Sequence, residues 1–140
     1  MIDAFSTPHN RIKTLILLVI CGLSAIAAAA VGIDDNPPGI LLVFLATTAL
    51  VLAFVHPWRT ARQFRFLLYT SALGLVLFAI LHNVFEVVSS KTASAGVLQI
   101  LLQGLGVAAF FLATLICPVA FIVGAVGLVA MFIRNRRRLT

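Results

Sequence analysis

Two ionisable side chains, His82 and Glu86, stand four residues apart inside an otherwise apolar stretch. On a helix this spacing places both side chains on one face, one turn apart, with Asn83 flanking the same face. Burying an ionisable group in a membrane is costly, so such residues are functional hypotheses by default. A histidine and a carboxylate one turn apart can provide half of a divalent-metal site or a step in a proton relay.

A second polar group, Asp34-Asp35-Asn36, separates two apolar runs and precedes Pro37-Pro38-Gly39. In a compact bundle this turn would approach the helix that carries His82. Carboxylates and an imidazole suit Zn²⁺ or Mn²⁺, although neither HExxH nor a repeated ligand spacing accompanies them. A divalent metal is therefore the cofactor that these residues suggest, and the candidate cluster comprises Asp34, Asp35, Asn36, His82, Asn83 and Glu86.

Both polar groups also have a structural interpretation. Asn36 can be the N-cap of a helix that begins at Pro37, and Asp34 and Asp35 would favour the positive end of that helix dipole. His82 can likewise form an interhelical hydrogen bond rather than a functional site.

Four apolar runs position these residues, at about 12–33, 39–55, 66–88 and 97–133, in a chain of 140 residues that is 62% hydrophobic. A spanning helix needs about 20 apolar residues. We therefore expect an all-α, polytopic membrane protein: one transmembrane domain over residues 1–140, folded as a four-helix bundle with antiparallel neighbours. The fourth run exceeds one span, and we expect it to be kinked near Pro118, which removes a backbone hydrogen bond.

The Lys and Arg residues predict the orientation. Nine of the ten fall at the N-terminus, in the second connection or at the C-terminus, and only Lys91 falls elsewhere. The positive-inside rule therefore predicts that both termini are cytoplasmic. Because the cations cluster at helix ends, they indicate contact with anionic lipid headgroups rather than with nucleic acid. The predicted headgroup anchors are Trp58, Arg59, Arg62, Arg65, Arg134, Arg136, Arg137 and Arg138.

Small residues recur at helical spacing on the first and fourth runs, where they would let helices approach closely. They are Gly22, Ala25, Ala29 and Gly32 on the first run, and Ala120 and Gly124 on the fourth. Their role is either packing inside the chain or contact with a second copy or a membrane partner.

Three functions remain open at this point. The first is a non-catalytic accessory protein or subunit that packs against a partner or itself. The second is a small oligomeric transporter or channel with His82 and Glu86 on its path. The third is a membrane enzyme that binds metal or a cofactor at its outer face through Asp34, Asp35, His82 and Glu86. No nucleophile with a paired base and no phosphate-binding loop is visible, which favours a non-enzyme. The small size suggests a prokaryotic plasma membrane.

Overall fold

The computed structural model describes residues 7–33, 36–91 and 96–137, and its regular elements are helices. In chain order they are α1 (Pro8–Val31), α2 (Pro37–Val55), α3 (Ala61–Lys91), α4 (Val97–Phe111), the π-helical segment η2 (Leu112–Ile116) and α5 (Cys117–Arg136). The segments α4, η2 and α5 follow one another directly and form a single helical run of 40 residues. Asp34, Asp35 and Arg138 lie outside the described residues.

Four helices are long and apolar enough to cross a membrane, which confirms the all-α prediction and indicates an integral membrane protein. The helices differ from the predicted spans mainly at their ends. For example, α3 covers Ala61–Lys91 rather than 66–88, so it includes Arg62, Arg65 and Lys91. The apolar run marks only the part suited to hydrocarbon, whereas a helix can continue into the headgroup region with its backbone hydrogen bonds intact.

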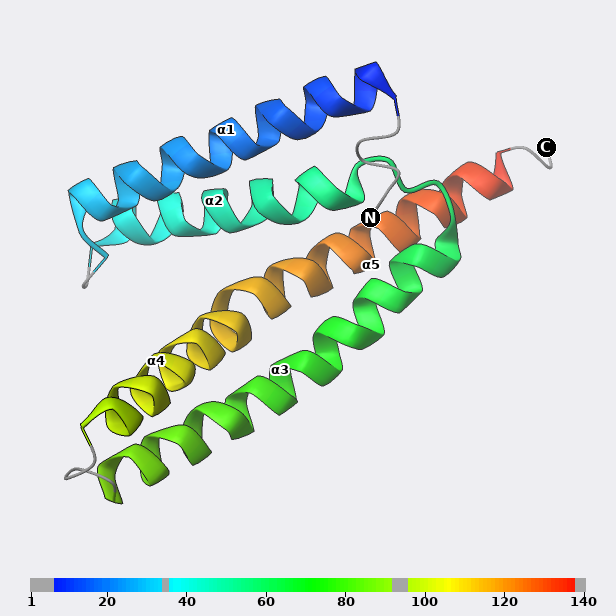
Figure 1. Cartoon of the computed structure of the whole chain (residues 1–140). Helices are drawn as coiled ribbons and strands as arrows, with labels where there is room; N and C mark the ends of the chain where they lie inside the picture. The colour runs from blue at the N-terminus through cyan, green and yellow to red at the C-terminus, as the bar shows by residue number, and fades with distance from the viewer. Residues whose placement is uncertain (1–6, 34–35, 92–95, 138–140) are drawn as a thin grey trace.

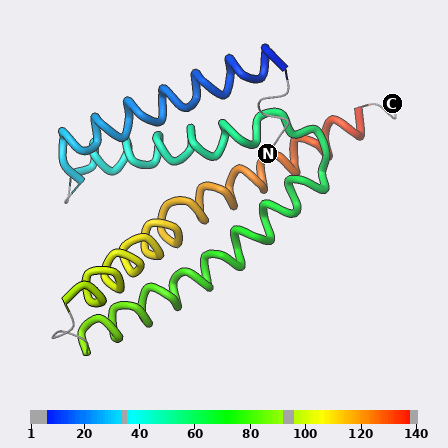
Figure 2. The backbone as a smooth tube through the Cα atoms, in the orientation of Figure 1, coloured from blue at the N-terminus to red at the C-terminus, as the bar shows by residue number. Residues whose placement is uncertain are grey.

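The helices form two antiparallel hairpins, α1–α2 and α3–α4/α5 (Figure 1). Among the described residues, α1 contacts α2 alone, and α2 in turn contacts η2 and α5. The helix α3 packs along α4, η2 and α5 but contacts neither α1 nor α2. The tube trace in Figure 2 shows the hairpins drawing together where α2 ends and diverging toward the α1–α2 turn. The four helices are thus joined through α2.

Small residues line the contacts between helices. Ala28 on α1 and Ala53 on α2 are almost completely buried, whereas Ile26 and Leu73 are 69% and 70% exposed. Such a distribution would be unfavourable in water, but lipid tails solvate large apolar side chains well, and helices in lipid associate through close packing. Thr14 is fully buried between α1 and α2, and its hydroxyl donates to the Asn10 carbonyl at 2.9 Å, with the Ala53 carbonyl 3.4 Å away.

Two predicted packing residues of the fourth run, Ala120 and Gly124, are buried. A Cβ on Gly124 would lie 3.1 Å from the backbone nitrogen of Leu68, so this glycine sets how closely α5 approaches α3. One turn further, the Phe64 ring occupies the space beside Gly127 where a side chain would lie. These residues serve packing inside the chain.

The turn between α1 and α2 depends on Gly32 and Gly39. Gly32 ends α1 with a φ of 88°, a conformation that favours glycine, and its N–H donates to the Ala28 carbonyl at 2.9 Å. A Cβ on Gly39 would collide with the Gly32 carbonyl. Asn36 and Pro37 occupy the predicted N-cap and first helical positions of α2, but the Asn36 side chain donates to the Val31 carbonyl at 3.0 Å instead of capping α2.

The segment η2 lies immediately before Cys117-Pro118. The Cys117 N–H donates to the Leu112 carbonyl, five residues back, in place of the usual four. Pro118 has no N–H to donate, and π-type turns are a known way to accommodate such an interruption. The kink expected near Pro118 stays a prediction.

We expect Gly39→Ala to destabilise the protein by about 1–3 kcal/mol, because its Cβ would meet backbone atoms that cannot rotate away. Unfolding of the purified protein in detergent, followed by helical circular dichroism, measures the change. Gly104→Ala is the matched control, since a Cβ there meets nothing within 4 Å. Equal stability of the two variants would contradict the close approach of α1 and α2.

Candidate functional site

Polar groups gather at two places, on opposite ends of the helices. One is the contact between α3 and α4 at His82. The other is the end at which α1 begins, α2 ends, α3 begins and α5 ends, which we call the basic end. The basic end carries Arg11, Lys13, Arg59, Arg62, Arg65, Arg134, Arg136 and Arg137, whereas Lys91 lies at the other end of α3.

His82 joins α3 to α4. Its Nδ1 lies 3.0 Å from the carbonyl oxygen of Gly106. A carbonyl can only accept a hydrogen bond, so Nδ1 is the donor, and Nε2 of a neutral ring is left as an acceptor. The imidazole also packs on Phe110, with ring centroids 5.2 Å apart. His82 therefore forms a hydrogen bond between α3 and α4, which is the structural alternative that the sequence suggested for it.

Glu86 lies beside His82 toward the Lys91 end of α3, as the spacing predicts. Its Oε2 is 3.8 Å from the His82 Nε2, and the two side chains are 70% and 31% exposed, respectively. At this distance and exposure the pair contributes little stability. Asn83 does not join the pair, because its Nδ2 donates to the Ala79 carbonyl of its own helix at 2.7 Å.

The described residues do not assemble the predicted cluster. Asn36 is hydrogen bonded within the α1–α2 hairpin, and neither helix of that hairpin contacts α3. Across residues 7–33, 36–91 and 96–137, no three His, Cys, Asp or Glu side chains come together as metal ligands would. The hypothesis of a metal site therefore has no support in this part of the chain, while Asp34 and Asp35 fall outside it.

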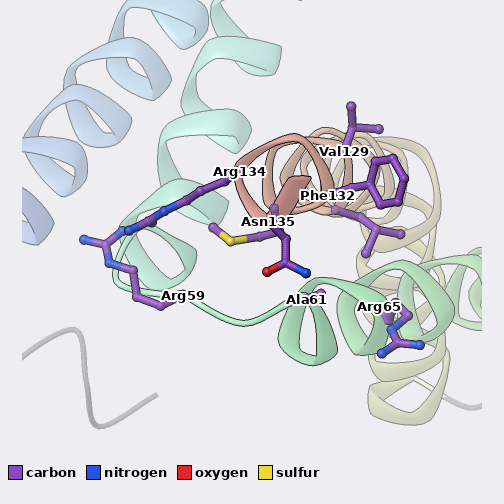
Figure 3. Close-up of a pocket in the computed structure, with 9 residues that line it drawn as sticks. Arg59, Ala61, Arg65, Val129, Phe132, Arg134 and Asn135 are labelled. Atoms are coloured by element: carbon purple, nitrogen blue, oxygen red, sulfur yellow. The ribbon is translucent and has the colours of Figure 1, made fainter. Parts of the chain in front are cut away.

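The basic end contains a cavity of about 870 Å³ between the start of α3 and the end of α5 (Figure 3). The residues that line it are Arg59, Ala61, Arg65, Leu128, Val129, Met131, Phe132, Arg134 and Asn135. Figure 3 shows Arg59 and Arg134 extending to the same side of the cavity, one from the α2–α3 connection and one from α5. Val129 and Phe132 extend to the opposite side of α5, where Arg65 of α3 lies (Figure 3). None of the lining residues is acidic.

A smaller cavity of about 390 Å³ adjoins the first through the shared residue Arg65. It is lined by Arg62, Arg65, Phe66 and Tyr69. Both cavities therefore combine guanidinium groups with apolar or aromatic surface, the combination that suits amphiphilic molecules.

The backbone that carries Arg59 is held by Gln63. The Gln63 Oε1 accepts hydrogen bonds from the backbone nitrogens of Arg59 and Thr60, both at 3.2 Å, and from the Thr60 hydroxyl at 2.8 Å. Trp58 packs edge-on against Phe64, with centroids 5.7 Å apart. Sequence reasoning missed Gln63, although Thr60-Ala61-Arg62-Gln63 has the spacing of a capping box. It also missed Asn135, which has no such signal.

Arg136 and Arg137, two further predicted anchors, also lie at the basic end, while Arg138 is outside the described residues. The Arg136 guanidinium lies 4.9 Å from the centroid of the Phe132 ring, and Arg137 follows the last turn of α5. Contact of these residues with lipid headgroups stays a prediction.

We expect His82→Ala to lower the free energy of unfolding by about 1 kcal/mol, because it removes an interhelical hydrogen bond and the packing on Phe110. Glu86→Gln should change it by less than about 0.5 kcal/mol, since that side chain is mostly exposed. Denaturant unfolding in detergent distinguishes the two. An equal loss in both variants would show that the His82–Glu86 ion pair stabilises the fold. A metal ion that the wild type binds stoichiometrically, and that is lost when both residues are substituted, would restore the metal hypothesis.

No family model, curated protein or solved structure matches this chain, so the function has to be argued from its own residues.

Proposed function

We propose that the protein is a non-catalytic membrane subunit that packs, through an exposed side of α1, against a partner subunit or a second copy of itself. In this proposal the basic end faces the cytoplasm, so that both termini are cytoplasmic in accord with the positive-inside rule. The observation that carries the proposal is the exposure of small residues on α1.

Three of the predicted packing residues on α1, Gly22, Ala25 and Ala29, are exposed within the chain. The buried positions of α1 are Thr14, Ser24 and Ala28. The first helix therefore has one small-residue side that packs in the chain and a second that is left open.

The exposed positions of α3 differ in composition from this side of α1. They are occupied mainly by large side chains such as Leu73, Leu77 and Ile80, which lipid tails accommodate well. Small residues at exposed positions contribute little contact with lipid, but they let a neighbouring helix backbone approach closely. On α1, large exposed side chains such as Leu23 and Ile26 are interspersed with the exposed small residues Gly22, Ala25 and Ala29. The presence of these exposed small residues favours α1 as the helix that meets a partner.

The hydroxyl groups within the spans also favour a structural role. Thr47, Thr48, Thr70 and Thr114 each donate to the carbonyl four residues earlier in their own helix, at 2.7–2.8 Å. Hydroxyls used in this way satisfy the helix rather than a reacting group. The transporter and the outer-face enzyme remain alternatives that depend on His82 and Glu86.

Gly22→Leu is expected to reduce or abolish assembly, because the added side chain would keep a neighbouring helix away. The variant should still fold, since a Cβ on Gly22 meets nothing within 4 Å of this chain. Native mass spectrometry after gentle extraction from the membrane should show wild-type protein in a complex heavier than the 15.0 kDa chain.

The matched control is Gly104→Leu, at another exposed helical glycine with nothing within 4 Å, and it should assemble like the wild type. A wild-type protein that is monomeric would contradict the proposal. So would a complex that Gly22→Leu leaves intact.

A further inference from the structure

We propose that the cavity between α3 and α5 binds one anionic phospholipid, with its phosphate at Arg65 and Asn135 and an acyl chain along Val129 and Phe132, which lie on the same side of α5 as Arg65 (Figure 3). This inference goes beyond the proposed function and rests on different residues. The site is at the basic end, whereas the assembly surface is a side of α1.

The positive charge of the lining residues supports an anionic ligand. Arg59, Arg65 and Arg134 line one cavity, and none of them forms an ion pair with another described residue. A guanidinium group without an anionic partner is well suited to phosphate, which it can bind through two parallel hydrogen bonds. Asn135 adds an amide that can donate to the same group.

The shape of the cavity is the second argument, and it distinguishes a lipid from free phosphate. Along α5 the lining changes from the apolar Leu128 and Val129 to the polar Arg134 and Asn135. Val129, Phe132 and Asn135 recur every third residue along one side of α5, and the six residues from Val129 to Asn135 correspond to about 9 Å along the helix axis. The cavity therefore joins acyl-chain depth to headgroup depth at one end of the membrane-spanning helices, and only an amphiphile would use both parts.

The cavity is also built on well-held elements. Gln63 fixes the backbone at Arg59 through its hydrogen bonds to Arg59 and Thr60. The close approach of α5 to α3, at Gly124 and Gly127, sets the distance between the two walls. A preformed cavity of this kind predicts a discrete site of one lipid, in contrast to the diffuse attraction that any surface arginine has for an anionic leaflet.

The requirement for an anionic headgroup is tested by native mass spectrometry of the protein in detergent with added phosphatidylglycerol or phosphatidylcholine. We expect one phosphatidylglycerol per chain and at least about tenfold weaker binding of phosphatidylcholine. Arg65→Gln should weaken phosphatidylglycerol binding about tenfold, since a hydrogen bond to a charged group is lost. Arg137→Gln removes the same charge from the basic end, but Arg137 does not line the cavity, so this variant should bind the lipid like the wild type.

The requirement for the apolar part of the cavity is tested with Val129→Trp, whose larger side chain should occupy the space of the acyl chain. Val126→Trp is the control. Both valines are exposed, at 58% and 63%, so neither change should disturb the fold, and only Val129 lines the cavity. Circular dichroism should show unchanged helical content in all variants. Phosphatidylglycerol binding should fall in Val129→Trp alone.

Several results would overturn the proposal. Equal loss in Arg65→Gln and Arg137→Gln would mean diffuse attraction to the positively charged basic end. Equal binding of phosphatidylcholine would remove the requirement for an anionic headgroup. Glycerol phosphate that competes as strongly as the intact lipid would identify a site for a soluble phosphate compound, and no retained lipid in the wild type would refute the site.

Discussion

The close approach of helix backbones at small residues is the interaction on which the rest of this structure depends. Lipid removes the driving force that water gives to burying leucine or phenylalanine, so helices gain from tight packing over small side chains instead. Ala28 and Ala53 provide such contacts in the first hairpin, and Gly124 provides one in the second, where α5 approaches Leu68 of α3. The large side chains then face outward, where they match the lipid. The same rule explains why exposed small residues on α1 are noteworthy: they have the composition of an interface without a neighbour in this chain.

Sequence patterns were sufficient for features that depend on composition or on local spacing. The apolar runs predicted the four spanning helices, and Asn36 and Pro37 predicted the start of α2. The four-residue spacing of His82 and Glu86 predicted their shared face. Contacts between distant segments were less accessible. The proposed cluster required the α1–α2 turn to approach α3, but α2 contacts η2 and α5 instead. A single sequence cannot reveal which helix of one hairpin contacts which helix of the other, because most faces here are equally apolar.

The candidate residues differ in how many of their polar atoms already have partners within the chain. His82 has its Nδ1 engaged by Gly106, and Asn83 is engaged by its own helix, so much of their hydrogen-bonding capacity serves the fold. The arginines of the basic cavity have no described acidic partner. Hydrogen bonds within the chain thus account for part of the polar capacity of His82 and Asn83, toward the Lys91 end of α3, whereas the basic end provides no described carboxylate for the arginines of the cavity. The positive-inside rule treats these arginines as determinants of orientation, and three of them, Arg59, Arg65 and Arg134, also line the cavity.

The fourth helical run, formed by α4, η2 and α5, contacts helices of both hairpins. Before η2, the segment α4 contacts α3 but not α2, while η2 and α5 contact both α3 and α2. The wider turn at Leu112–Ile116 inserts an additional residue into the helical repeat, and this rotates every later side chain about the helix axis relative to an uninterrupted α-helix. The junction between the hairpins therefore begins where the helix changes register. Pro118 removes the hydrogen bond that would otherwise stabilise the uninterrupted α-helical alternative, so the sequence favours the wider turn at this position. A change in register just ahead of α5 also sets the faces that Gly124 and Gly127 present to α3, and with them the width of the cavity at the basic end.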